Sequence, residues 1–476
     1  MLLGEYFAII NFMDRHEEQY IKMTQTPIPK LVTTLAIPMV VSMLVSAIYN
    51  MADTYFVSQL GTSASGAVGV VFSIMAIIQA VGFMLGMGSG AQISRLLGQK
   101  ENRQANVVAI NGLVSALSFG ILLMIIGVIY NEPILRLLGS TDTIMPHAKA
   151  YAEYIFYGAP FMMGSFLLNN VLRSQGKAKF AMIGITVGGV LNIILDPIFI
   201  FYFRLGAGGA ALATAISQMI SFIVLLVPFL RKITEVELSF KYFSFNPMVL
   251  FGLMGNGFPS FIRQALASGA TVLLNRQASL YGDPAIAAMS IVMKIVMVIF
   301  VIMLGFGQGY QVVVGYNFGA RIYGRVRESF AFSLKVGMSI MAFFAIIGFI
   351  FSKGIITIFI ADDPLVIEIG SLALRAQCIA MLFMPFSTIT NMTFQSLGKS
   401  WTATFLSSLR QGLFFIPLII ILPNYLGING VQFTQAISDV LTFAVSLPFA
   451  AVFFSRLKQN KITHPKDRVA VDLAMD

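Results

Sequence analysis

The sequence predicts an all-α integral membrane protein, with twelve transmembrane helices arranged as two parallel six-helix repeats. Composition supports the membrane part of this prediction, because 57% of the 476 residues are hydrophobic and only 11% are charged. Soluble domains average about 45–50% apolar and about 25% charged residues. A water-soluble domain could not cover this much apolar surface.

A second observation is an internal repeat with a spacing of 221 residues. Pro38 recurs as Pro259 and the basic Lys100 as Arg321, and the segment LGAGGAALATAIS returns in the same register as LGINGVQFTQAIS. The glycines that keep this spacing are Gly61 and Gly282, Gly86 and Gly307, Gly88 and Gly309, Gly98 and Gly319, and Gly209 and Gly430. Two homologous halves in one membrane are typical of secondary transporters, which hold the substrate between the repeats.

The third observation is a series of twelve apolar stretches, each near the length of about twenty residues that spans a bilayer core. They begin near Leu31, Gly66, Val107, Tyr151, Phe180, Ala207, Met248, Pro284, Phe330, Gly370, Thr402 and Ile428. Six fall in each repeat. Because an even number of spans returns the chain to its starting side, both halves should share one orientation, related by an axis along the membrane normal.

These spans divide the chain into five segments. They are an N-terminal cytoplasmic or interfacial segment (1–30), an N-lobe (31–231), a cytoplasmic linker (232–247), a C-lobe (248–455) and a cytoplasmic tail (456–476). The first segment opens with MLLGEYFAIINFM, which lacks the basic leader and the cleavage site of a signal peptide. Two interpretations stay open for it: a short interfacial helix, or the product of an upstream start codon with Met23 as the true initiator.

The orientation of the spans follows from the positions of the cations. Alternate loops carry Arg95, Lys100 and Arg103; Arg173, Lys177 and Lys179; Arg231, Lys232 and Lys241; Arg321, Arg325 and Arg327; and Lys399. The opposite loops carry fewer cations, interspersed with acids. The positive-inside rule therefore places the first set of loops and both termini in the cytoplasm.

Ionisable side chains inside a span cost about 2.5–3.5 kcal/mol each, so those that persist are candidates for function. They are Asp53 and Asp196 in the first half, and Lys294, Arg410 and Asp439 in the second. Arg263 and Arg375 are expected nearer helix ends, where a long side chain can reach the membrane interface.

The segment LNIILDPIF places Asn192 four residues before Asp196, on the same helix face, and Pro197 directly after it. Proline removes a backbone donor and disturbs the helix, which leaves carbonyl oxygens free. A carboxylate, an amide and free carbonyls make a small cation or proton site with Pro197 as its hinge. The alternative is a structural hydrogen bond that pins a proline kink.

Three further residues complete this candidate site. Thr214 is the expected hydroxyl partner, because its helix follows that of Asp196 across a short loop. Asp53 either faces the same cavity or contacts solvent at a helix end, and Tyr151 either joins the cluster or lies in an interfacial aromatic belt. In the second half, Asp439 is predicted to neutralise Lys294 or Arg410 in one charge network. A role in binding substrate is the alternative for that network.

Several motifs resemble those of the multidrug and toxic compound extrusion (MATE) family. They are ADTYFVSQLG, LRSQGKAK, LNIILDPIFIF, GAGGAALATAIS and SLRQGLFFIP, the last of which is similar to the DinF-like and MepA-like prokaryotic branches. The resemblance implies a V-shaped, two-lobed antiporter in the bacterial cytoplasmic membrane that exports amphipathic cations in exchange for protons or sodium. It also implies that Asp53, Asn192, Asp196 and Thr214 form the proton or sodium site, with Tyr151 as a less certain member. The chain departs from the NorM-type pattern, which has carboxylates in helices 7 and 10.

Other classes of function fit less well. No nucleophile with a base and no metal cluster lies at membrane depth, so an enzyme is not expected, nor is any cofactor beyond the coupling proton or sodium. The basic loops do not form a continuous face for nucleic acid. We expect a monomer whose partners are membrane lipid and small amphipathic substrates. A flippase or exporter of a lipid-linked or other endogenous metabolite, in the same superfamily, remains the alternative.

Overall fold

The computed structural model describes residues 16–360 and 362–458, and nearly all of them are helical. A helix over residues 16–25 precedes the spans. The first half contains α2 (Ile28–Ser58), α3 (Thr62–Gly98), α4 (Asn102–Ile129), α5 (Asn131–Leu137), α6 (Met145–Ser174), α7 (Ala178–Pro197), η1 (Ile198–Tyr202) and α8 (Gly206–Leu230). After η2 (Phe240–Tyr242), the second half contains α9 (Pro247–Ser279), α10 (Asp283–Gly319), α11 (Tyr323–Ile350), α12 (Ser352–Phe359), α13 (Pro364–Met381), α14 (Met384–Ser396), α15 (Ser400–Ser408), η3 (Leu409–Phe414), α16 (Phe415–Leu426) and α17 (Ile428–Lys458).

These helices confirm the predicted fold class. Within the described ranges, eleven helical segments are long and apolar enough to cross a membrane. The twelfth expected span is α9, which is 33 residues long but carries polar residues along its length, among them Asn256, Arg263 and Gln264. All twelve predicted spans begin within about two helical turns of an observed helix start.

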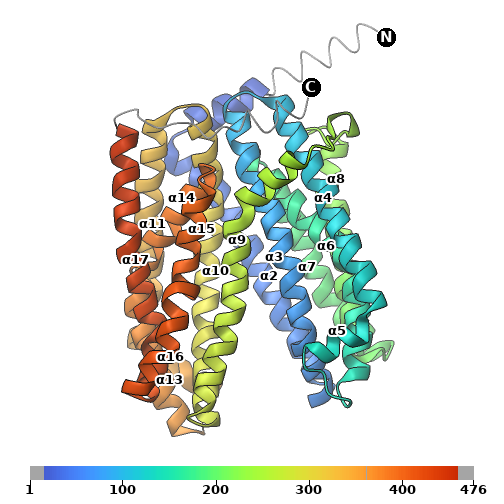
Figure 1. Cartoon of the computed structure of the whole chain (residues 1–476), viewed down its shortest axis with the longest axis vertical. Coiled ribbons are helices and arrows are strands. Elements are labelled where there is room, and N and C mark those ends of the chain that lie inside the picture. Colours follow the sequence, from blue (N-terminus) through green and yellow to red (C-terminus); the bar gives the residue numbers. More distant parts are fainter. Residues whose placement is uncertain (1–15, 361, 459–476) are drawn as a thin grey trace.

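The helices form two lobes, and these separate at the end opposite residues 16 and 458, the first and last that the structure describes (Figure 1). One lobe contains α2 to α8 and the other contains α9 to α17. The two repeats run parallel, because the last residues of α3 and α10, Gly98 and Gly319, lie at the same end of the molecule. A Cβ atom on Gly98 would lie 2.1 Å from the carbonyl oxygen of Tyr316, and one on Gly319 would lie 2.1 Å from that of Arg95.

Glycines that obey the repeat spacing also let the lobes touch through their backbones. A Cβ atom on Gly88 of α3 would lie 2.1 Å from the carbonyl oxygen of Leu253 in α9. Its repeat partner Gly309 in α10 lies against α2, where a Cβ atom would be 2.5 Å from the Cα atom of Ala36. Any larger residue would force these helices apart. The repeated glycines thus close the end of the molecule where residues 16 and 458 lie, which we call the closed end.

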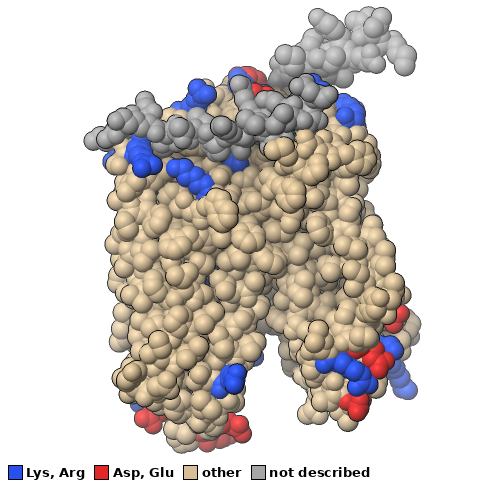
Figure 2. Space-filling model, viewed as in Figure 1, with Lys and Arg blue, Asp and Glu red and all other residues tan. Residues whose placement is uncertain are grey.

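The surface has the charge distribution of a membrane protein. On the face shown in Figure 2, a broad belt without charged side chains lies between two charged ends, and a cleft between the lobes opens away from the closed end. Lys100, Lys241 and Arg325 are among the cations at the closed end, where α3, α6, α8 and α10 also finish. The belt matches what a hydrocarbon core requires.

The helix over residues 16–25 crosses the closed end and contacts both lobes. The side-chain amide of Gln19 donates to the carbonyl oxygen of Gln175 in the N-lobe (2.7 Å). The side-chain amide of Asn317 in the C-lobe donates to the carbonyl oxygen of Met23 (3.1 Å). The part of the first segment that the structure describes is therefore helical and packed against the transmembrane helices. Residues 1–15 lie outside the described residues.

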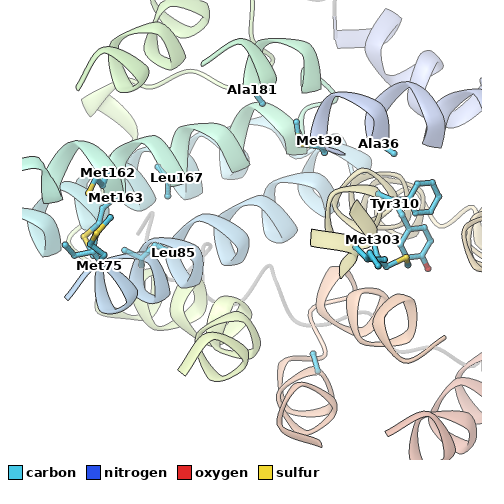
Figure 3. Packing of buried hydrophobic residues seen from close by; sticks show 14 of the residues in the cluster. Ala36, Met39, Met75, Leu85, Met162, Met163, Leu167, Ala181, Met303 and Tyr310 are labelled. Atoms are coloured by element: carbon cyan, nitrogen blue, oxygen red, sulfur yellow. The ribbon is translucent and has the colours of Figure 1, made fainter. Parts of the chain in front are cut away.

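Each lobe has a packed apolar interior. In the N-lobe, Met75 and Leu85 of α3 meet Met162, Met163 and Leu167 of α6 (Figure 3). The same figure shows a second contact zone, where Ala36 and Met39 of α2 lie beside Met303 and Tyr310 of α10. The second zone joins the two lobes, so any change in the shape of α2 bears directly on the interface between them.

Candidate cation site

The centre of the N-lobe holds a cluster of buried polar side chains from four helices. On α7, the side-chain amide of Asn192 donates to Asp196 Oδ1 (3.1 Å) and also lies 3.1 Å from Thr214 Oγ1 on α8. α8 can begin this close to η1, the turn that follows α7, because Gly209 has no side chain: a Cβ atom there would lie 2.7 Å from the carbonyl oxygen of Phe199. The structure therefore brings together the three residues that the sequence predicted from α7 and α8.

The other half of the cluster comes from α2 and α6. The hydroxyl of Tyr151 on α6 donates to Asp53 Oδ2 on α2 (3.1 Å), and both side chains are buried. Asp53 follows Tyr49 by one turn of α2, and the Tyr49 ring lies 3.2 Å from the position that a Cβ atom on Gly189 of α7 would take. α2 approaches α7 at Gly189, where a Cβ atom would lie 2.7 Å from Val45 Cγ1. Asp53, predicted to face either this cavity or solvent, belongs to the cluster.

Several oxygen atoms of this cluster have no hydrogen-bond partner within the described residues. They are Asp53 Oδ1, Asn192 Oδ1, Asp196 Oδ2 and the hydroxyl oxygen of Ser217. A buried acceptor left unpaired costs about 1–3 kcal/mol, and more if it is charged. A proton on a carboxylate or a monovalent cation among these oxygens would remove that cost. The arrangement is thus chemically suited to bind and release a small cation.

Ser217 borders the cluster on α8, beside Gly188 of α7, and sequence reasoning missed it. It lies on α8, less than one turn after Thr214, and is fully buried. Serine is common in membrane helices, where it usually bonds to its own backbone. Its only sequence signal is its position on the same face as Thr214, three residues later.

Pro197 ends α7 and is followed at once by the π-helical turn η1. The backbone N–H of Phe203 donates to the carbonyl oxygen of Ile198 (2.9 Å), five residues back. Since proline lacks an N–H, the carbonyl oxygen of Ile193 has no α-helical donor. π-turns occur frequently at functional sites. The helix is therefore irregular directly beside Asp196, although whether Pro197 acts as a hinge stays a prediction.

The second-half charges are arranged differently. Asp439 Oδ1 accepts from Arg410 Nε (2.6 Å) and from the amide of Gln435 (3.1 Å), and Asp439 Oδ2 accepts from the amide of Gln377 (2.6 Å). The Arg410 guanidinium also lies 4.5 Å from the centre of the Phe300 ring. Both carboxylate oxygens of Asp439 are therefore paired, which favours a structural role.

Lys294 does not belong to this network, contrary to the prediction. Its side chain is exposed on α10 and makes no ion pair with any residue that the structure describes. The guanidinium of Arg410 occupies the position beside Asp439, because the π-turn η3 brings it there.

The expected position of Arg263 is also wrong. It lies halfway along α9 and not near a helix end. Its Nη2 atom lies 3.8 Å from the sulfur of Met87 on α3, in the opposite lobe. Arg375 donates to the hydroxyl of Ser352 (2.8 Å) at the end of α12 nearest α11.

Comparison with protein families gives one match that spans both halves. The MatE family model matches residues 38–198 and again residues 259–421. The two matched ranges begin at Pro38 and Pro259, the first pair of the internal repeat. The family model therefore recognises each half of the chain as one copy of the same unit.

Individual relatives match over nearly the whole chain. The multidrug export protein MepA of Staphylococcus saprophyticus is 28% identical over 94% of this chain and 98% of its own length. MepA of Staphylococcus aureus is 27% identical over 93% and 97%. Among solved structures, a MATE protein in complex with MaL6 matches with a TM-score of 0.88 at 26% identity, covering 92% of this chain and 99% of that one. An outward-facing multidrug resistance MATE transporter of the MOP superfamily matches with a TM-score of 0.86 at 26% identity, covering 92% and 98%.

Proposed function

Because this chain belongs to the MatE family of multi-pass membrane transporters, we propose that it is a secondary antiporter that exports amphipathic, cationic drugs or toxic compounds in exchange for inward-moving protons or sodium. One observation carries the assignment of the ion site. The buried oxygens of Asp53, Asn192 and Asp196 are left partly unpaired, whereas the carboxylate of Asp439 has both oxygens paired. A coupling site must exchange its ion, and of these buried aspartates that the structure describes, Asp53 and Asp196 have carboxylate oxygens available for one, whereas Asp439 does not.

The path from ion binding to lobe movement runs through α2. Two carboxylates in one buried cluster repel each other when both are charged, and a proton or sodium ion between Asp53 on α2 and Asp196 on α7 removes that repulsion. α2 also contacts α10 of the C-lobe at Ala36 and at Val40, where Gly305 approaches it. A change in α2, or in α7 at Pro197, therefore alters the interface between the lobes. Such a shared element is what coupling between two sites requires.

The same proposal gives an orientation in a bacterial cytoplasmic membrane, with both termini in the cytoplasm. It is supported by the cations at the closed end and by the bacterial relatives named as multidrug export proteins. In that orientation the cleft in Figure 2 opens to the outside. The transporter works as a monomer among membrane lipids, with the proton or sodium as its coupling ion and no other cofactor.

Everted membrane vesicles test this function, since their lumen corresponds to the outside of the cell. We expect vesicles containing the protein to accumulate the cationic dye rhodamine 123 when the lumen is acidified or loaded with sodium, and to lose it when an ionophore collapses the gradient. Vesicles from cells without the gene are the control. Equal accumulation with and without the gene under both gradients would contradict drug export. A flippase of lipid-linked cargo would give that result, because it does not transport the dye.

A further inference from the structure

We propose that Arg263 is a specificity-determining residue, whose guanidinium binds an anionic group of the exported molecule. The inference rests on the proposed function and names a residue that would recognise the substrate. Its basis is the position of Arg263, its lack of a counter-charge and the polar groups around it.

Arg263 lies where the two lobes begin to separate. The backbones of α3 and α9 are in direct contact at Gly257, where a Cβ atom would lie 1.7 Å from the carbonyl oxygen of Met84. Arg263 follows six residues later, which corresponds to about 9 Å along the helix toward the open end. Its contact with Met87 spans the two lobes. Gly257, Pro259 and Ser260 are buried, whereas no residue from Phe261 to Gly269 is, so Arg263 lies where α9 leaves the lobe contact, at the floor of the cleft.

The charge of Arg263 has no partner within the described residues. It forms no ion pair there, and its one recorded side-chain contact with a hydrogen-bond acceptor is the sulfur of Met87, a weak acceptor. Arg410 shows the contrast, because its charge faces Asp439 at 2.6 Å. Arginine stays protonated in proteins, so Arg263 cannot become neutral in the membrane. An unpaired cation at this depth is costly and calls for an anionic partner.

The described residues around Arg263 do not supply an anionic partner, so the partner must be a bound molecule. Ser260, one turn before it, donates its hydroxyl to Met87 (3.2 Å) and accepts from the amide of Gln395 (2.7 Å). The hydroxyl of Ser260 and the amide of Gln395 are polar but uncharged, so they make this part of the cleft polar and do not neutralise the charge of Arg263. The planar guanidinium offers two parallel donors, which match the two oxygens of a carboxylate.

The fold itself does not require a cation at this position. The repeat partner of Arg263 is Ser42 on α2, whose hydroxyl donates to the carbonyl oxygen of Pro38 (2.9 Å). A small residue thus occupies the equivalent place in the other lobe. The charge is specific to the C-lobe side of the cleft.

A matched pair of dyes tests the inference by fluorescence anisotropy with the full chain in nanodiscs. Rhodamine 110 carries a free carboxylate, and rhodamine 123 is its methyl ester. We expect Arg263→Gln to weaken the binding of rhodamine 110 by roughly tenfold or more, as for loss of a charge-assisted hydrogen bond, and to leave rhodamine 123 unchanged or slightly tighter. Arg263→Lys should keep most of the affinity for rhodamine 110, which excludes misfolding as the cause. Arg276→Gln, which removes an exposed charge from the same helix, should bind both dyes as the unchanged protein does.

Two results would overturn the inference. Equal effects of Arg263→Gln on the two dyes would show that the guanidinium does not recognise the carboxylate. An effect that appears only in nanodiscs containing phosphatidylglycerol, and not in phosphatidylcholine alone, would assign Arg263 to a lipid headgroup. The vesicle experiment separates these results from the function itself, because gradient-driven export of rhodamine 123 does not depend on this carboxylate.

Discussion

Asp196 and Asp439 are both buried aspartates in the membrane, 0% and 1% exposed, but their surroundings differ. Asp439 accepts hydrogen bonds on both oxygens, one of them from a guanidinium. Asp196 accepts one bond, from the amide of Asn192, and keeps its other oxygen unpaired within the described residues. The number of donors around each carboxylate therefore separates a structural acid from one that can exchange an ion.

The structural role of Asp439 predicts that the Asp439→Asn variant is less stable. The change leaves Arg410 without its counter-charge inside the lobe, which costs on the order of 3 kcal/mol. We expect a lower thermal unfolding temperature of the purified protein in detergent. The double variant with Arg410→Gln should lose less stability than the sum of the two single variants, because the residues interact directly. Additive losses would contradict the pairing.

Ser217 provides a second test at this scale. If its hydroxyl oxygen is a ligand of the coupling ion, Ser217→Ala should lower the apparent affinity for that ion several-fold, since one hydrogen bond contributes about 1 kcal/mol. The measurement is the proton or sodium concentration that gives half-maximal transport. Ser221→Ala is the matched control, because Ser221 lies one turn further on α8 and donates to the carbonyl oxygen of Gly184 (2.9 Å). An unchanged ion dependence in Ser217→Ala would remove Ser217 from the site.

The sequence predicted the members of the N-lobe cluster better than those of the C-lobe network. Asn192 and Asp196 share a helix face at a spacing of four residues, the cost of a carboxylate in a span singled out Asp53, and the short loop before its helix indicated Thr214. Motif resemblance then supported these residues, with Tyr151 as a less certain member. The prediction that Lys294 joins the Asp439 network was wrong, because the sequence does not determine how a long apolar helix is rotated about its axis. In the sequence, the lipid-facing side and the buried side of α10 cannot be told apart, because both are apolar.

At the scale of elements, the repeated glycines account for how the two lobes meet. The spacing of Gly88 with Gly309 is visible in the sequence, but the contact partners Leu253 and Ala36 are not. The π-turns η1 and η3 were not predicted either, beyond the disturbance expected after Pro197. They occur at different positions of the two repeats, so the internal symmetry gives no indication of them.

The glycine contact between α10 and α2 can be tested directly. Gly309→Ala places a methyl group 2.5 Å from the backbone of Ala36, which neither helix can accommodate without moving. We expect lower thermal stability and slower transport. Gly269→Ala is the matched control, because Gly269 is helical, exposed and has no atom within 4 Å of the new methyl group. Equal behaviour of the two variants would argue against a tight lobe contact at Gly309.

At the scale of the whole molecule, the structure shows one arrangement of two lobes, which touch at the closed end and are separate at the other. Arg95 of α3 donates to the carbonyl oxygen of Ser396 in the C-lobe (2.9 Å), and the helix over residues 16–25 bridges both lobes at the same end. These contacts must break if the cleft is to open on the other side. The sequence predicted two lobes from the repeat, but their relative placement depends on contacts between residues hundreds of positions apart.

The central claim is that ion loading at Asp196 drives export. Asp196→Asn imitates the neutral carboxylate but cannot cycle between charged and neutral forms. In everted vesicles we therefore expect no gradient-driven accumulation of rhodamine 123 by this variant, although the purified protein should still bind the dye. Asp142→Asn, which alters an exposed acid in a loop, should transport normally. Full gradient-driven accumulation by Asp196→Asn would contradict the claim, and Asp53 would then become the leading candidate for the coupling carboxylate.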